Sequence, residues 1–236
     1  MKKFLLMAAF AFFGMTNAQV KYGVKAGYNL SNLAASSPAS SAQILLGNKS
    51  GFNAGAFVEY NFNEKFALQG EVLYNNLGGK AKADASKIPS YAEFNLADVF
   101  DDAEIASTKK ASATININQI SVPLSAKYTF DNKVSLLGGF SVNFLTGVST
   151  KAEIDGKDVK SSFQNEVLGN TNIDSELKKQ ISSTNFGLHI GAEYSISENV
   201  FVDARYNFGV SSLNKNFTDL ATLKQRYFQF GVGYKF

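Results

Sequence analysis

The chain's only histidine, His189, is the first candidate for acid–base chemistry. A lipid-modifying or proteolytic enzyme would need a Ser or Asp beside this base. The surrounding segment, Phe186-Gly-Leu-His-Ile-Gly-Ala-Glu193, contains no His-x-Ser motif and no pair of acids. Glu193 lies four residues further on the same face of a strand, too far for direct contact. We therefore predict no enzyme and no catalytic residue, with His189 as a satisfied interior side chain.

A cluster of acidic residues is the candidate for metal binding. Asp98, Asp101, Asp102 and Glu104 offer oxygen ligands at a density that could hold Ca²⁺. Their spacing matches no EF-hand, and the apolar residues between them favour an amphipathic turn with a solvated acidic face. We expect no metal and no cofactor, and cation binding by segment 98–104 is the alternative.

Another set of ionisable residues alternates with apolar ones along the chain. The set is Lys25, Glu59, Glu71, Lys127, His189, Glu193, Asp203 and Arg205, with Lys235 near the C terminus. If these side chains point into a narrow barrel, opposite charges should pair and fill it, because eight strands leave room only for their own side chains. We predict a polar lumen network. A selectivity filter for small solutes is the alternative.

The C-terminal segment shows which element positions such residues. From Arg226 to Phe236, aromatic and aliphatic residues occupy one face of a strand, and polar residues and glycines occupy most of the other. This period of two, ending on an aromatic residue, is typical of a membrane-spanning β-strand with one face toward lipid.

Seven more segments share the alternation, and none has a charge on its apolar face. The eight segments are 22–28, 52–60, 66–74, 120–130, 134–144, 186–194, 200–208 and 226–236. Short turns rich in Asn, Asp and Glu alternate with long connections at 31–51, 76–118, 147–184 and 211–225. We predict an all-β fold, an eight-stranded antiparallel up-and-down transmembrane β-barrel with long extracellular loops and both termini periplasmic.

Aromatic residues at the strand ends support this register. Tyr22, Tyr60, Phe66, Tyr128, Tyr194 and Tyr234 would lie at one interface. Tyr28, Phe52, Tyr74, Phe144, Phe186, Phe208 and Phe228 would lie at the other. A soluble barrel such as a lipocalin is the alternative, with its apolar face turned inward.

The N terminus predicts export. Lys2 and Lys3 precede the apolar run 4–14, and Ala18 precedes the expected cleavage point, so 1–18 is predicted as a signal peptide and 19–236 as the barrel domain. Without those two lysines, 21 basic residues face 20 acidic ones, so no nucleic-acid partner is implied. The absence of Cys excludes disulfides and a lipid-anchored lipoprotein.

Two segments resemble the PorT-like outer-membrane β-barrel family. Tyr22-Gly-Val-Lys-Ala-Gly-Tyr-Asn-Leu-Ser-Asn-Leu33 is similar to the strand that opens this barrel, and Gln119-Ile-Ser-Val-Pro-Leu-Ser-Ala-Lys-Tyr128 to a later strand of it. The resemblance implies an eight-stranded barrel in the outer membrane of a Gram-negative cell. It also implies that the barrel-insertion machinery reads the C-terminal strand, with Tyr234 and Phe236 as the assembly signal.

The sequence favours a non-enzymatic role. We predict a membrane-anchored scaffold, or an envelope or secretion accessory, whose partners are outer-membrane lipid, the insertion machinery and proteins or ligands that contact the long loops. A narrow porin for small solutes and a lipid-modifying barrel enzyme are the second and third hypotheses.

Overall fold

The computed structural model describes residues 19–36, 43–45, 47–84, 110–130, 133–154, 157–158, 172–215 and 222–236. The predicted signal peptide and the acidic segment 98–104 lie outside these residues. Of the helices within this part of the chain, none is long and apolar enough to span a membrane.

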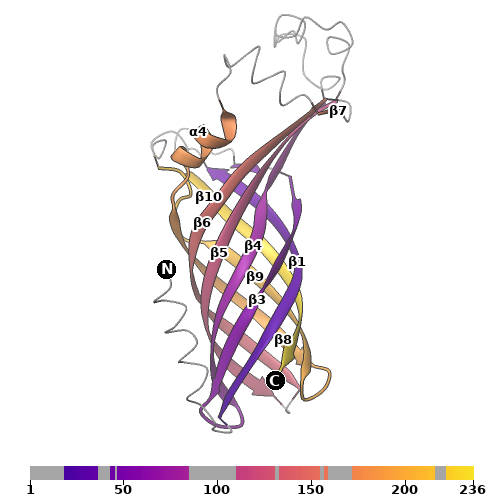
Figure 1. Ribbon diagram of the computed structural model, residues 1–236, viewed down its shortest axis with the longest axis vertical. Coiled ribbons are helices and arrows are strands. Elements are labelled where there is room, and N and C mark those ends of the chain that lie inside the picture. Colours follow the sequence, from indigo (N-terminus) through magenta and orange to yellow (C-terminus); the bar gives the residue numbers. More distant parts are fainter. Residues whose placement is uncertain are drawn as a thin grey trace, which may run out of the picture.

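Eight antiparallel strands close into a ring (Figure 1). They are β1 (Val20–Ser36), β3 (Lys49–Asn61), β4 (Phe66–Asp84), β5 (Lys110–Phe130), β6 (Val134–Ile154), β8 (Thr184–Ser195), β9 (Val200–Gly209) and β10 (Thr222–Lys235). Each strand pairs with the next of these in the chain, and β1 with β10 closes the ring from Gly23↔Lys235 to Ser36↔Thr222. The predicted fold class is confirmed.

Within the described residues, two short strands and one helix adjoin the ring. Strand β2 (Gln43–Leu45) pairs with β1, and β7 (Lys157–Asp158) pairs with β6. Helix α4 (Ile173–Gln180) lies at the end opposite the C terminus (Figure 1). Part of the region predicted as a loop between 147 and 184 is therefore helical.

The connections at the end that holds the C terminus are short. Between β3 and β4, the Asn63 side chain accepts hydrogen bonds from the backbone N–H groups of Lys65 (2.9 Å) and Phe66 (2.8 Å). Between β8 and β9, Ser197 Oγ accepts one from the Val200 N–H at 3.1 Å. Such local bonds stabilise tight turns, which is why Asn and Ser occur there.

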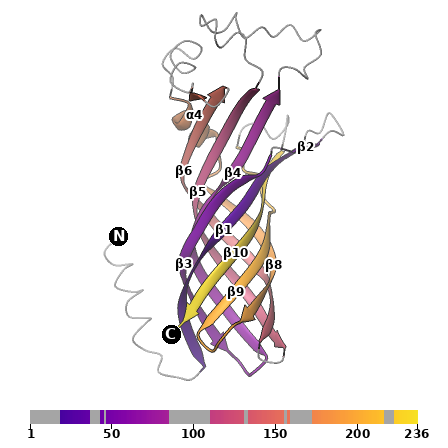
Figure 2. The ribbon, with the colours of Figure 1, turned by 90° about the vertical axis from the view of Figure 1, so that its right-hand side faces the viewer.

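The strands are longer than the sequence predicted at the other end. Strands β4, β5 and β6 have 19, 21 and 21 residues and project beyond the rest of the barrel (Figure 2). The predicted loop 76–118 is therefore strand as far as Asp84 and again from Lys110. Gly78 lies inside β4 with a φ of 145°, and a Cβ there would stand 1.9 Å from the Ile115 carbonyl oxygen.

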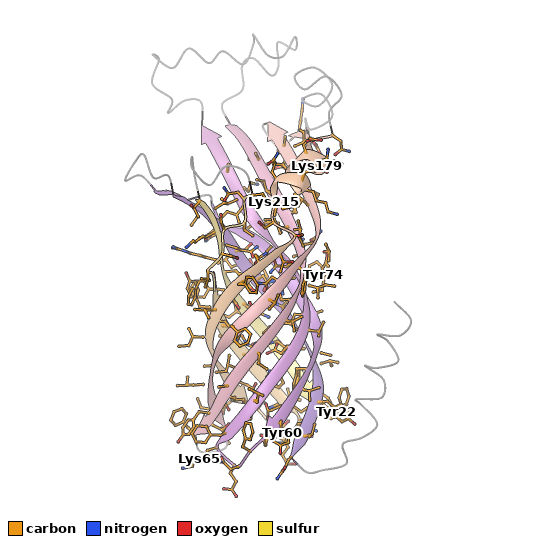
Figure 3. The ribbon with its side chains drawn as sticks, turned by 90° about the vertical axis from the view of Figure 1, so that its left-hand side faces the viewer. Tyr22, Tyr60, Lys65, Tyr74, Lys179 and Lys215 are labelled. Carbon is orange, nitrogen blue, oxygen red and sulfur yellow. The ribbon has the colours of Figure 1, made fainter. Side chains whose placement is uncertain are left out.

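The outward face carries the predicted apolar residues. Tyr22 and Tyr60 lie near the short turns, and Tyr74 lies toward the other end (Figure 3). Mid-strand residues such as Val72 (56% exposed) and Ile190 (63%) leave most of their side chains uncovered by protein. A soluble barrel would bury these side chains, so this surface is suited to contact lipid.

Candidate functional site

The lumen holds a first group of four buried charges near the short turns, here called the basal cluster: Glu59, Lys127, Glu193 and Lys235. Lys127 Nζ donates to Glu59 Oε2 (2.8 Å) and to Glu193 Oε1 (2.6 Å). Lys235 Nζ donates to the same Glu193 oxygen at 2.7 Å. Two ammonium groups and two carboxylates from four strands thus neutralise one another. Lys235, the last residue of β10, is buried within this cluster.

A second group, the central cluster, lies further inside: Lys25, Glu71, Asp203 and Arg205. Lys25 Nζ donates to Asp203 Oδ2 at 2.7 Å and lies 3.7 Å from Glu71 Oε2. Arg205 Nη1 donates to Glu71 Oε1, and its Nε lies 2.9 Å from Asp203 Oδ2. This cluster is also neutral, and it links β1 and β4 to β9 across the lumen.

Two aromatic rings separate the clusters. Phe57 and Phe201 are 2% and 0% exposed and meet edge to face, with centroids 5.5 Å apart. Phe57 is two residues from Glu59 and pairs with Glu71, whereas Phe201 is two residues from Asp203. Alternation in the sequence does not reveal this barrier, because both rings lie on the strand face that otherwise carries polar residues.

Glycines make room for these rings. A Cβ at Gly23 would stand 2.5 Å from Phe57 Cζ, and a Cβ at Gly233 would stand 2.1 Å from Phe201 Cζ. Both distances are too short for a real contact. The rings therefore pack directly on the backbones of β1 and β10, beside the seam where the barrel closes.

His189 has a serine partner that the local sequence did not reveal. Its Nε2 lies 2.7 Å from Ser125 Oγ. His189 on β8 pairs with Gly139 on β6, and Gly139 pairs with Ser125 on β5. Because glycine has no side chain, the residues on either side can meet across it. His189 and Ser125 are only 4% and 0% exposed, so the pair lies out of reach of a substrate.

Amide and hydroxyl groups fill the next level of the lumen. Asn53 Nδ2 donates to Asn29 Oδ1 (3.0 Å), Asn29 Nδ2 to Asn75 Oδ1 (3.1 Å), and Asn75 Nδ2 to Ser121 Oγ (2.9 Å). This series of hydrogen bonds joins four neighbouring strands, β1, β3, β4 and β5. It makes a continuous polar wall above the central cluster.

An apolar cap closes the lumen at the end of the long connections. It consists of Leu33, Ile117, Val148, Ile181 and Leu213, all at most 9% exposed. A register shift between Asn118 and Gln119 in the β5–β6 pairing sets Val148 opposite Ile117, so that both side chains enter the cap. Even-numbered residues of β6 face outward nearer the short turns, so alternation alone would have placed Val148 outside.

Helix α4 is attached beside this cap. Asn172 caps it by accepting a hydrogen bond from the Ser175 N–H at 3.1 Å. Asp174 accepts from the Thr150 N–H (2.8 Å) and hydroxyl (2.7 Å), which fixes the helix to β6. Leu177 then packs against the apolar cap.

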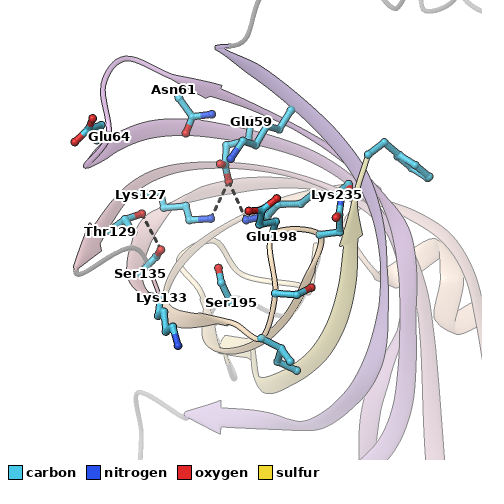
Figure 4. A pocket seen from close by; sticks show the side chains of 15 residues that line it. Glu59, Asn61, Glu64, Lys127, Thr129, Lys133, Ser135, Ser195, Glu198 and Lys235 are labelled. Atoms are coloured by element: carbon cyan, nitrogen blue, oxygen red, sulfur yellow. Dashed lines mark hydrogen bonds and ion pairs between the residues drawn. The ribbon is translucent and has the colours of Figure 1, made fainter.

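The opposite end of the barrel is open. A vestibule of about 730 Å³ lies between the short turns, and its lining includes Glu59, Lys127 and Lys235 of the basal cluster (Figure 4). Ser195 and Ser135 line its wall. The basal cluster is therefore the floor of a polar cavity that opens to solvent.

The two predicted assembly residues lie at the closing seam. Tyr234 is exposed on the lipid face of β10. The Phe236 N–H donates to the Tyr22 carbonyl at 2.9 Å, and the two rings have centroids 5.6 Å apart. The last residue thus ties the final strand to the first.

No group of three or more His, Asp or Glu side chains that could hold a metal ion occurs in the described part of the chain. The acidic segment 98–104 is outside that part. The lumen carboxylates already have cationic partners, so they offer no cation site.

One comparison, with a protein-family model, supports this architecture. A family model described as "Outer membrane protein beta-barrel domain" matches residues 16–215. A search of curated proteins found no match. Among solved structures, Ail of Yersinia pestis aligns with a TM-score of 0.44 and 15% identity over 92% of this chain and 99% of Ail. Neisserial surface protein A aligns with a TM-score of 0.43 and 17% identity, over 91% of this chain and 97% of that protein. OprG of Pseudomonas aeruginosa aligns with a TM-score of 0.38 and 12% identity, over 92% of this chain and 95% of OprG.

Proposed function

Because this chain belongs to the outer membrane protein β-barrel domain family, we propose that it is a non-enzymatic, membrane-anchored scaffold. Its closed barrel holds surface segments beyond the lipid, where they contact a protein or ligand. Strands β4, β5 and β6 project furthest and would present such a contact surface (Figure 2).

One observation carries the proposal: side chains fill the lumen at successive levels. The basal cluster, the Phe57–Phe201 pair, the central cluster and the apolar cap follow one another along the barrel. A solute would have to separate buried ion pairs and then cross an apolar layer, and both steps are costly. This favours an anchor over a pore.

The lumen also argues against a hydrolytic enzyme. Ser125 and His189 lie within hydrogen-bonding distance as a nucleophile and a base, but both are buried between strands. Catalysis requires a substrate atom within hydrogen-bonding reach of such a pair. The polar vestibule, by contrast, favours a narrow porin as a second candidate, with the basal cluster as its filter.

Conductance in planar lipid bilayers separates these candidates. The scaffold predicts that the wild-type protein shows no steady ion current. Arg205→Ala, which leaves Glu71 with one cation fewer, should conduct in bursts as water enters the central cluster. A wild-type barrel that conducts steadily, with Arg205→Ala changing only its ion selectivity, would favour the porin.

The finer assignment is to the PorT-like barrels, with residues 1–18 removed as a signal peptide and both termini periplasmic. In this assignment the insertion machinery reads Tyr234 and Phe236 on β10. Deleting Phe236 should leave refolding in detergent nearly intact yet reduce the amount of protein that reaches the outer membrane in cells. Unchanged outer-membrane levels would refute this role.

A further inference from the structure

Two basic residues extend the lipid-facing side of β10. Phe230 and Phe228 are 48% and 49% exposed, and Arg226 and Lys224 are the next two outward positions along the strand. Each step of two residues advances about 7 Å. The two cations therefore lie just beyond the apolar band, at the depth where lipid headgroups begin.

Neither cation has a protein partner among the described residues. No hydrogen bond or ion pair joins Lys224 or Arg226 to another side chain in this part of the chain. Two other basic residues at this end do have acidic partners: Lys80 lies 3.7 Å from Glu153, and Lys179 lies 2.7 Å from Glu176.

Lys49, at the same end of the barrel, is a basic residue that does have protein partners. Its Nζ donates to Asn76 Oδ1 at 2.5 Å and to the Ser50 carbonyl at 3.2 Å. Burial, together with the charge of Lys151, lowers the pKa of this ammonium group from its ordinary value. Lys224 and Arg226 are instead half-buried on the outer surface.

Among the described residues, the outer surface next to Lys224 and Arg226 carries no compensating acid. Across the strand pairs, Arg226 faces Asn32 and Phe208, and Lys224 faces Ala34. The described residues 29–36, 47–53, 204–210 and 222–230 contain no Asp or Glu. Asn32 donates to Asn48 Oδ1 at 3.4 Å and adds an amide to the same area. The local charge is thus +2 from these two residues.

We propose that Lys224 and Arg226, here called the cationic patch, bind the phosphate group of a membrane lipid. A guanidinium can donate two parallel hydrogen bonds to phosphate oxygens, and an ammonium group adds a second positive charge. The lipid's acyl chain would lie along Phe228 and Phe230, directly below on the same strand. This apolar contact favours a lipid over free phosphate, because free phosphate could use only the cations.

Native mass spectrometry of the folded protein in micelles, titrated with phosphatidic acid or phosphatidylcholine, tests the site. The wild type should bind phosphatidic acid more tightly, since its phosphate is not shielded by choline. Replacing Lys224 and Arg226 by Gln should weaken this binding by roughly fivefold for each cation removed. Added salt should weaken binding to the wild type.

The matched control is Lys65→Gln with Lys133→Gln, two basic residues at the opposite end of the barrel. This variant should keep the wild-type affinity, and both variants should retain the heat-dependent gel mobility of a folded barrel. Equal affinity of the wild type and the Lys224→Gln/Arg226→Gln variant would overturn the proposal. Inorganic phosphate that competes as strongly as the lipid would show that the patch binds free phosphate, and would overturn the assignment to lipid.

Discussion

Each charged side chain in the two lumen clusters has an oppositely charged partner on another strand or on its own strand. Both partners of each pair are buried from water. Removing one member of such a pair leaves the other buried and uncompensated. We expect Arg205→Ala to lower the free energy of unfolding in detergent by about 3–5 kcal/mol. Lys179→Ala, which breaks an exposed pair with Glu176, should change it by less than about 0.5 kcal/mol. Equal effects would mean that the central cluster is solvated.

The contact between Gly233 and the Phe201 ring makes a separate prediction about packing. Gly233→Ala would place a methyl group 2.1 Å from Phe201 Cζ and should destabilise the barrel by about 1–3 kcal/mol. Gly138→Ala is the control, because its new Cβ would have no neighbour closer than 3.7 Å. Chemical denaturation of both variants measures the difference. A Gly233→Ala protein as stable as Gly138→Ala would contradict the tight ring packing.

Alternation in the sequence placed the charged lumen residues on one face, and the structure brings them together as two clusters. The partners within each cluster could not be assigned, because they depend on how far each strand is staggered around the ring. Glu71 meets Arg205 across 134 positions of sequence. The side chains of Ser125 and His189 can meet only because Gly139, on the strand between theirs, has no side chain. No residue near His189 in the sequence indicates this contact.

At the scale of the strands, the lipid-facing register can be tested by placing Arg at two outward positions that differ in membrane depth. Val122 lies in the middle of β5 on the outward face, and Val134 lies at the start of β6 near the short turns. Arg at Val122 should cost about 2–4 kcal/mol, whereas Arg at Val134 should cost about 0–1 kcal/mol. Unfolding titrations in lipid vesicles measure both. A similar cost at the two positions would mean that the two residues do not differ in membrane depth.

Strand ends were less predictable than strand centres. The period of two located the parts that cross the membrane, because lipid requires an apolar outer face there. Beyond the lipid this requirement disappears, so the sequences of β4 and β5 near Lys80 and Ala113 look like loop. Pairing with neighbouring strands continues there all the same, as far as Asp84↔Lys110. Helix α4 lies in a segment that the sequence predicted as a long connection, and its attachment to β6 depends on the hydrogen bonds between Asp174 and Thr150.

For the whole molecule, the central claim is that the barrel is closed. The apolar cap and α4 block one end, and the basal cluster blocks the floor of the vestibule at the other. Such a barrel uses its interior for stability and leaves its outer surfaces for contacts. The absence of native Cys lets single cysteines report on this directly.

The most direct test compares Ser121→Cys with Ser195→Cys in the folded protein. Ser121 is 1% exposed inside the lumen, whereas Ser195 lines the vestibule. A charged, water-soluble thiol reagent should label Ser195→Cys rapidly and Ser121→Cys only after unfolding. Both variants should react equally in denaturant, which shows that the reagent is active and that both cysteine thiols can react. Rapid labelling of Ser121→Cys in the folded barrel would show an open lumen and would contradict the account.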